Sequence, residues 1–509
     1  MKLLLASIHI DNNSRAIPLG AAMLVSSLHK HCPDTIEPVL LNLYLAQTAV
    51  ECAELILEHK PDAVGFSIYL WNRVLSLEIA DILKKQIPDI ILFAGGPEAS
   101  ADYNRLLKNS ALDFALMGEC EESVVTAMKH LLEDKSPNNI EVTTTPASIK
   151  DLAKLPSPYL DGTLNLADYS GVLWELSRGC PFKCAFCYES RGTSGIRRFP
   201  IDRVRSELQL FVKAEVAEIF VLDPTFNYNR KASKEMLRLI IKEAPLIDFF
   251  FEIRSEFIDE EMAQLFACVN GSIQIGLQSS SNKVLKCINR TIDKNDFENK
   301  ILLLHQAGAT YGFDLIYGLP HDTYKGFCKS LDFAMSLMPN HVDIFPLSVL
   351  PGTELHDTAA NLGIKHLPDN PYMVTSSETF SEHDMQRAKD LAAAFDLFYN
   401  GGRAVPWFET IRDTLNISPS KFFTKFAEKI KTEPKTNIVL QQISFVSELL
   451  RKNGKEDLVS IACDIIAYFG YDEYLFDENM SLEFEHDPEE LIELIDSGIT
   501  DLRELANSF

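Results

Sequence analysis

Hydrophobic positions in residues 1–135 follow two alternating patterns: short, nearly continuous apolar runs, and longer segments with a single apolar face. The apolar runs predict buried strands at residues 2–9, 39–45, 63–69, 90–95 and 112–117. The segments between them predict helices at residues 18–30, 50–60, 74–86 and 121–133. Short strands alternating with helices are typical of a Rossmann-like, parallel α/β sheet, which binds ligands at the carboxyl ends of its strands.

A second alternating series occupies residues 171–380, after an irregular stretch at 136–170 that we interpret as a linker. Its apolar runs predict strands at residues 172–176, 218–222, 249–253, 272–276, 312–316 and 342–347. Six strand–helix units are fewer than the eight of a closed barrel of this type. The pattern therefore predicts an open, partial (β/α)6 barrel.

The strand pattern stops at about residue 381, and residues 381–509 are predicted to form a helical, acidic C-terminal domain. Helical patterns cover, for example, residues 385–399 and 436–452. The last forty residues are strongly acidic. We interpret them as a solvated helical face or tail, with a docking surface for a basic partner as the alternative.

Composition narrows the classes of function. The 509 residues include 46% hydrophobic and 24% charged residues, as in ordinary globular proteins. The formal net charge of −25 is opposite in sign to that of most nucleic-acid-binding proteins, so no nucleic-acid partner is expected. His9 and Asp11 interrupt the first apolar run, and no run approaches the ~18 apolar residues of a membrane span. We therefore expect a cytoplasmic protein without a membrane partner, whose ten cysteines are not a disulfide framework.

The strongest chemical signal is the stretch SRGCPFKCAFCYESRG, which places Cys180, Cys184 and Cys187 in the loop after the first strand of the second series. A structural zinc site usually has four protein ligands, and no fourth Cys or His lies nearby. Three thiolates suit a 4Fe–4S cluster in which one iron stays open for a small chelating ligand. A zinc knuckle or a chance cluster is the alternative.

This motif, with Phe186 as its aromatic residue, resembles the signature of radical S-adenosylmethionine (SAM) enzymes. The resemblance implies that the open iron chelates the methionine part of SAM. An electron from the cluster then cleaves SAM to a 5′-deoxyadenosyl radical, which abstracts hydrogen from unreactive carbons. The cofactor carries the hard chemistry, and the protein orients it and excludes water.

Further stretches along the second series are similar to this family. They are VLDPTFNYN, in which Pro224 replaces the family's second Asp, then FFFEIRSE, IGLQSSS, DLIYGLPHDT and FPLSVLPGTEL. His321 stands where the cobalamin and porphyrinogen-oxidase branches often have Gly. The resemblance implies that the residues facing SAM are Phe186, Asp223, Glu252, Arg254, Gln278 and Ser279. An ion pair without a role at SAM is the alternative for Glu252 and Arg254.

The N-terminal domain resembles the cobalamin-binding domain of class B enzymes in this superfamily, through the fragments IPLGAAMLVSSL, GFSIYLWN, FAGGPEAS and MGECEES. Cys120 departs from the family's Gly-Glu-Gly-Glu. The resemblance implies that the residues lining cobalamin are Pro18, Leu19, Ser67, Tyr69, Trp71, Asn72, Gly95, Gly96, Pro97, Glu98, Gly118 and Glu119. A Rossmann-type scaffold that has lost its ligand is the alternative.

The usual Asp-x-His-x-x-Gly motif for a lower cobalt ligand is missing, because the region around His9 has the wrong spacing and order. We therefore expect no protein imidazole on cobalt. The candidates for its lower face are Tyr69, Trp71 and Asn72.

The whole-chain resemblance, which includes FDLFYNGGRAVPWF at residues 395–408, is to cobalamin-domain radical SAM proteins with an added C-terminal domain. It implies a 4Fe–4S cluster, SAM and cobalamin as cofactors, and a flavodoxin- or ferredoxin-type electron donor. The expected reaction is methylation of an unactivated carbon in a small molecule or peptide. A cobalamin-dependent cyclase or rearranging oxidoreductase is the alternative.

Two further hypotheses are a methylthiotransferase and a sensor without catalysis. A methylthiotransferase acting on tRNA or protein would need a second cluster, for which the N-terminal cysteines are Cys32, Cys52 and Cys120. Only Cys120 lies in a predicted strand-end loop. The intact set Glu252, Arg254 and Gln278 is evidence against a sensor.

Overall fold

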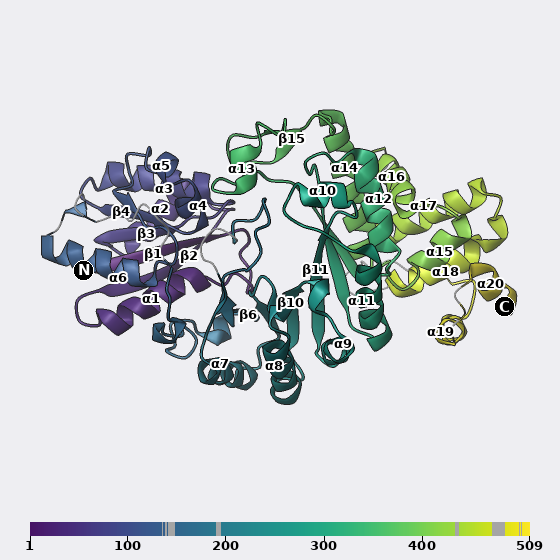
Figure 1. The fold of residues 1–509 in the computed structure, drawn as a ribbon, viewed down its shortest axis with the longest axis horizontal. Helices are drawn as coiled ribbons and strands as arrows, with labels where there is room; N and C mark the ends of the chain where they lie inside the picture. The colour runs from purple at the N-terminus through teal and green to yellow at the C-terminus, as the bar shows by residue number, and fades with distance from the viewer. Residues whose placement is uncertain are drawn as a thin grey trace. The chain divides into compact units, whose positions relative to one another are not determined.

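The computed structural model describes residues 1–134, 136–137, 140, 148–189, 195–432, 437–470, 484–497, 499 and 501–509 (Figure 1). The chain divides into two compact units. The first unit comprises residues 1–273 and 348–374, and the second comprises residues 274–347 and 375–509.

The first unit begins with a five-stranded sheet in the order β2-β1-β3-β4-β5. The strands are β1 (Lys2–His9), β2 (Glu37–Tyr44), β3 (Ala63–Ser67), β4 (Ile91–Gly95) and β5 (Phe114–Ala115). All of its neighbouring strands pair in parallel. The helices that follow the strands are α1 (Leu19–His31), α2 (Ala49–Glu58), α3 (Arg73–Gln86), α4 (Pro97–Ala101), α5 (Tyr103–Leu106) and α6 (Glu121–Asp134).

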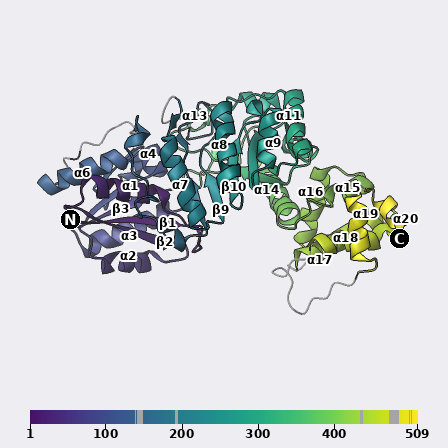
Figure 2. The ribbon, with the colours of Figure 1, turned by 90° about the horizontal axis from the view of Figure 1, so that it is seen from below.

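Side-chain alternation along β1 explains why helices cover both faces of this sheet. Leu4 and Ala6 join a core with residues of α2 and α3, whereas Leu3 and Leu5 join a second core with residues of α1 and α6. Figure 2 shows α1 and α6 on one side of the sheet and α2 and α3 on the other. The strand order reverses beside β1, so the carboxyl edge near β1 and β3 is where such a sheet binds ligands.

The second sheet has six strands in the order β13-β12-β11-β10-β9-β6. They are β6 (Gly171–Trp174), β9 (Glu218–Val221), β10 (Asp248–Ile253), β11 (Gly271–Gln278), β12 (Tyr311–Tyr317) and β13 (His341–Pro346). The pairs β6–β9, β9–β10 and β12–β13 are parallel. The intervening helices are α7 (Ile201–Lys213), α8 (Arg230–Glu243), α9 (Glu260–Ala267), α10 (Asn282–Lys286), α11 (Lys294–Ala307) and α12 (Tyr324–Met335).

A short antiparallel ribbon, which the sequence pattern does not predict, follows β6. It pairs β7 (Ser177–Arg178) with β8 (Arg197–Arg198). Two residues per strand are too few to give a hydrophobic period, so such a ribbon is invisible to pattern analysis.

Residues 348–374 extend past β13 and rejoin the N-terminal domain within the first unit. They contain α13 (Glu354–Thr358), β14 (Lys365–His366) and β15 (Val374–Ser376), the last of which continues into the second unit. Arg73 donates through Nη1 to the hydroxyl of Tyr372 (3.0 Å) and to the carboxylate of Glu98 (2.7 Å). The Arg73–Glu98 pair is buried, so the segment is fixed by a desolvated polar contact.

The second unit continues into helices. They are α14 (Glu382–Phe395), α15 (Phe408–Leu415), α16 (Pro419–Ile430), α17 (Ile438–Lys452), α18 (Val459–Gly470), α19 (Pro488–Asp496) and α20 (Leu502–Ser508). Their core is aromatic: Phe398 packs edge-on against Phe422 and Phe426 at 5.2 and 4.8 Å between ring centroids.

Some of the expected segments lie outside the described residues. They are the acidic stretch at 471–483, residues 138–139 and 141–147 of the predicted linker, and Thr436 at the start of a predicted helix. Among the helices that the structure describes, none is long and apolar enough to cross a membrane.

Candidate active site

A cavity of about 600 Å³ lies at the carboxyl edge of the N-terminal sheet. The sheet side contributes residues from β1, β3 and β4 and from the turn at residues 118–121. The opposite wall comes from the start of the second strand series and includes Glu175, Arg178, Cys187 and Tyr188. The N-terminal sheet and the cysteine motif therefore share one cavity, within the first unit.

A second cavity of about 540 Å³ adjoins the first. Both are lined by Gly20, Ala21, Ser67, Tyr69, Glu175, Arg178 and Leu222. The second is also lined by the loop between β1 and α1. A long ligand that crosses the strand ends could occupy both spaces.

The cysteine loop, residues 179–189, starts directly after β7. Its backbone is fixed at Ala185, whose carbonyl accepts a hydrogen bond from the Leu355 amide (2.8 Å). Burial raises the pKa of Cys180, and it raises the pKa of Cys187 to about 11. The thiols are thus protonated at neutral pH until a metal displaces the protons.

Among the described residues, no group of three or more His, Cys, Asp or Glu side chains converges as ligands of a single metal ion do. In a four-iron cluster each thiolate binds a different iron, so its ligands stand farther apart than those of one ion. Three cysteines in one loop, of which Cys187 lines the cavity, suit such a cluster better than a single ion.

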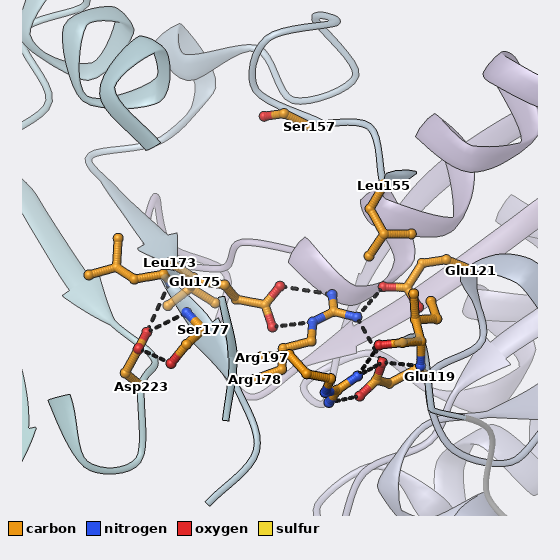
Figure 3. A network of polar contacts seen from close by, with 12 residues as sticks. Glu119, Glu121, Leu155, Ser157, Leu173, Glu175, Ser177, Arg178, Arg197 and Asp223 are labelled. Carbon is orange, nitrogen blue, oxygen red and sulfur yellow. Dashed lines mark hydrogen bonds and ion pairs between the residues drawn. The ribbon is translucent and has the colours of Figure 1, made fainter. Parts of the chain in front are cut away.

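A network of charges connects the start of the cysteine loop to the turn at residues 118–121 (Figure 3). Arg178 Nη1 lies 2.7 Å from Glu121, while Nε and Nη2 donate to both oxygens of Glu175 at 3.1 and 2.8 Å. Arg197 donates to both oxygens of Glu119, at 2.8 and 2.5 Å. None of the partners of Glu119 was predicted from the sequence, although Arg178 stands within the cysteine motif itself.

Burial and the two arginines act in opposite directions on these carboxyls. Burial raises the pKa of Glu121, and Arg178 offsets part of that rise. Burial also acts to raise the pKa of Glu119, but hydrogen bonds from Arg197 and the Ile149 amide hold it below its usual value. Glu119 is therefore ionised and forms an ion pair with Arg197.

Comparison with known proteins agrees with this geometry. The model of the B12 binding domain family matches residues 11–127, and that of the radical SAM superfamily matches residues 174–334. The chain carries a B12-binding domain followed by a radical SAM domain. Both matches confirm the resemblance predicted from the sequence, and with it the expected cofactors, a 4Fe–4S cluster, SAM and cobalamin.

Two curated relatives are similar over much of the chain. The cobalamin-dependent radical SAM methyltransferase TokK of Streptomyces tokunonensis is 25% identical over 67% of this chain and 54% of its own length. The 2-(S-pantetheinyl)-carbapenam-3-carboxylate methyltransferase of Streptantibioticus cattleyicolor is 25% identical over 62% of this chain and 51% of its own. The chain thus spans about half the length of these relatives.

One solved structure extends the similarity of fold to the whole chain. The cobalamin-dependent S-adenosylmethionine radical enzyme OxsB, with aqua-cobalamin bound, superimposes with a TM-score of 0.63 at 14% identity. The superposition covers 100% of this chain and 83% of OxsB. It confirms the predicted fold class: an α/β B12-binding domain, a partial radical SAM barrel and a helical C-terminal domain.

Most of the residues predicted to contact cobalamin line the two cavities of the B12-binding domain. The first cavity is lined by Ser67, Tyr69, Gly95, Gly96, Pro97, Gly118 and Glu119. The second is lined by Pro18, Leu19, Ser67, Tyr69 and Trp71.

Asn72 and Glu98 line neither cavity. The Asn72 side chain is fully buried and donates to the carbonyls of Ile8 and Ser67 at 3.1 and 3.0 Å. Glu98 is turned toward Arg73. Both residues follow a strand of the sheet, but the side chain of Asn72 binds backbone carbonyls and that of Glu98 binds the buried guanidinium of Arg73.

Gly95, the last residue of β4, leaves room for a ligand in the B12-binding domain. Among the described residues, and apart from the two adjacent in the chain, a Cβ added at Gly95 would have only Cys120 Sγ within 4 Å, at 4.0 Å, so a side chain there would project into the cavity. Gly96 is instead required by the fold, because it has φ +96° and a Cβ there would meet the Ile68 carbonyl at 2.7 Å. Gly95 therefore allows a cofactor to approach the backbone closely.

The side of the second cavity near Trp71 is aromatic. The rings of Tyr69 and Trp71 stack at 4.5 Å, and Trp71 donates to the Ile8 carbonyl (3.0 Å). His9 also lines this cavity, but its Nε2 donates to Oδ1 of Asn42 (3.1 Å), so this nitrogen is not available to a metal.

Among the predicted SAM residues, Arg254 is close to the cysteine loop. Its guanidinium lies 3.8 Å from the ring centroid of Phe182, between Cys180 and Cys184 in sequence, and it pairs with Glu256. Glu252, on the same face of β10, is exposed, and Phe186 is partly buried. The structure thus brings Arg254 to the motif.

Asp223 holds the backbone that leads into the cysteine loop. It accepts hydrogen bonds from the amides of Leu176 (2.9 Å) and Ser177 (3.2 Å) and from the Ser177 hydroxyl. Burial raises the pKa of Asp223 to about 6. Its oxygens are engaged within the protein, which indicates support of the loop.

Gln278 and Ser279 belong to the second unit, at the carboxyl end of β11. Gln278 has φ +63° and is 7% exposed, and its Oε1 has no hydrogen-bond partner among the described residues. A strained backbone with an unsatisfied buried amide oxygen is typical of a ligand site. Ser279 contacts the Ser330 hydroxyl at 3.3 Å.

Proposed function

We propose that this protein is a radical SAM enzyme that uses cobalamin to methylate an unactivated carbon. One observation carries the proposal: the cavity of the B12-binding domain has Cys187 and Tyr188 of the cysteine loop in its wall. A shared cavity allows the two cofactors to act on one substrate.

Cys180, Cys184 and Cys187 would hold the cluster, with SAM beside Arg254, and cobalamin would occupy the two adjoining cavities. When bound, the cluster supplies the electron that cleaves SAM to the 5′-deoxyadenosyl radical, and cobalamin supplies the methyl group. The Arg254 guanidinium, seated on Phe182, offers hydrogen-bond donors beside the loop. Buried Leu5 and Phe93 in the first cavity exclude water from the reacting groups.

The two curated relatives are both methyltransferases, which favours methyl transfer over cyclisation or rearrangement. The substrate proposed is a small molecule or peptide, the electron donor a flavodoxin or ferredoxin, and the compartment the cytoplasm. The methylthiotransferase hypothesis loses support, because Cys52 packs on one face of the N-terminal sheet while Cys32 and Cys120 pack on the other. Cysteines on opposite faces cannot share a second cluster.

The test is anaerobic product analysis of the reconstituted protein with SAM and a chemical reductant. We expect bound cobalamin, about four irons per chain, and formation of both 5′-deoxyadenosine and S-adenosylhomocysteine. The latter product reports transfer of the SAM methyl group. Replacing Cys180, Cys184 and Cys187 together with Ala should abolish iron binding and 5′-deoxyadenosine formation.

Three outcomes would contradict the proposal. Iron retained by the triple variant would contradict the cluster assignment. Formation of 5′-deoxyadenosine without S-adenosylhomocysteine would favour the cyclase or rearrangement alternative. About eight irons per chain would restore the methylthiotransferase hypothesis.

A further inference from the structure

Arg178 has an unusual position between the two cofactor domains. It is the last residue of β7 and stands two positions before Cys180. Its side chain is only 12% exposed and contacts carboxylates from both domains: Glu175 on the barrel side, and Glu121 on the side of the B12-binding domain. A third carboxylate, Glu119, lies 3.6 Å from Nη1.

The turn that Arg178 contacts is part of the wall of the first cavity. Gly118, Glu119, Cys120 and Glu121 all line it, and so does Arg178. Arg197, on the partner strand β8, holds Glu119 of the same turn. Two arginines of one ribbon therefore clamp one turn, and the ribbon leads directly into the cysteine loop (Figure 3).

We propose that Arg178 is a positioning residue that sets the separation between the cluster and cobalamin. The inference rests on the proposed function, since both cofactors must bind. The planar guanidinium presents separate nitrogens to Glu175 and Glu121 at fixed angles, which the single ammonium of a lysine cannot do. The next residue, Gly179, has φ +94°. Because glycine has a wide range of backbone conformations, the cysteine loop can change its orientation when the ion pairs of Arg178 are weakened.

The test uses electron paramagnetic resonance of the full chain, reconstituted with a 4Fe–4S cluster and hydroxocobalamin and then reduced. Cob(II)alamin and the reduced cluster each carry an unpaired electron, and their dipolar coupling falls with the inverse cube of their separation. We expect the cob(II)alamin signal of wild type to have broadened lines and faster spin relaxation, because of its dipolar coupling to the reduced cluster. Arg178→Lys, compared with wild type at equal iron and cobalamin contents, should lose that broadening.

Arg203→Lys is the matched control. Arg203 is 13% exposed, pairs with the buried Glu207 and stacks on Phe199, but it lines neither cavity. It should lose a comparable amount of stability and keep the wild-type broadening. Glu121→Gln is a second variant for the case in which Arg178→Lys does not fold, because it removes the charge of Glu121 from the same ion pair on the side of the B12-binding domain. It should also weaken the broadening.

The outcomes separate this inference from the proposed function. Wild-type broadening in both Arg178→Lys and Glu121→Gln would overturn the positioning role and leave the proposed function intact. A wild-type protein in which both signals are present but do not interact would do the same. Absence of the cluster or the cobalamin signal from wild type would overturn the proposed function, and this inference with it.

Discussion

Substitution of Gly95 with Leu tests whether the cavity at the strand ends is the cobalamin site. In the part of the chain that the structure describes, Cys120 Sγ at 4.0 Å is the one non-adjacent atom within 4 Å of a Cβ at this position, so the leucine side chain would extend into the cavity. Inserting such a side chain between packed partners costs about 1–3 kcal/mol. We therefore expect the dissociation constant for cobalamin to rise about 5- to 150-fold. The fold should not suffer, because the cobalamin-free cavity has room for the side chain at the end of β4.

The assay combines an anaerobic titration with hydroxocobalamin, followed by absorbance, and thermal unfolding of the cobalamin-free protein. Gly65→Ala is the contrasting control, because it also lines the cavity but a Cβ there would meet Phe93 Cζ at 2.4 Å and Leu5 Cδ2 at 2.8 Å. The control should lower the melting temperature of the cobalamin-free protein, and Gly95→Leu should not. Unchanged cobalamin affinity in Gly95→Leu would refute the reasoning.

Three further predictions concern SAM, cobalt and the barrel. Arg254→Ala should weaken SAM binding about ten- to hundredfold with iron content unchanged, because hydrogen bonds to a charged group contribute about 1.5–3 kcal/mol; equilibrium dialysis would measure it. The cob(II)alamin spectrum should lack nitrogen splitting from a lower ligand, since the Asp-x-His-x-x-Gly motif is missing, and such splitting would contradict the assignment. Burial raises the pKa of Asp322 from its ordinary 3.8 to about 6. The folded state therefore holds this proton more tightly than the unfolded state, and stability falls as the pH rises from about 4 to above 6. Urea unfolding should show that the fall in stability between about pH 5 and pH 8 is smaller by about 1–2 kcal/mol in Asp322→Asn than in wild type, since other buried carboxyls such as Asp223 keep their share of it.

The sequence was sufficient for features that depend on local pattern. Apolar runs predicted the strands of both sheets because each run fills a buried strand, and the spacing of Cys180, Cys184 and Cys187 predicted a shared loop. The strand-end fragments predicted much of the cavity lining, since parallel strands bring their carboxyl ends to one edge.

Features that depend on distant partners could not be predicted. Arg197 and Glu119 are 78 residues apart, and nothing near either residue indicates the other. For Asn72 and Glu98 the sequence predicted a place in the cofactor cavity, and neither residue lines it. A polar residue at a strand end has the same sequence signature whether it faces a ligand or satisfies buried backbone, as Asn72 does at Ile8 and Ser67.

The contact between Arg73 and Tyr372 has a consequence for the order in which the chain assembles on the ribosome. Arg73 and Glu98 are 25 residues apart and can pair soon after synthesis, but Tyr372 lies 299 residues beyond Arg73. At a synthesis rate of roughly 5–20 residues per second, the nascent B12-binding domain waits roughly 15–60 s for its last buried partner. During that interval the polar surface around Arg73 stays hydrated, so a truncated N-terminal domain would resemble a biosynthetic intermediate more than a finished cofactor-binding module.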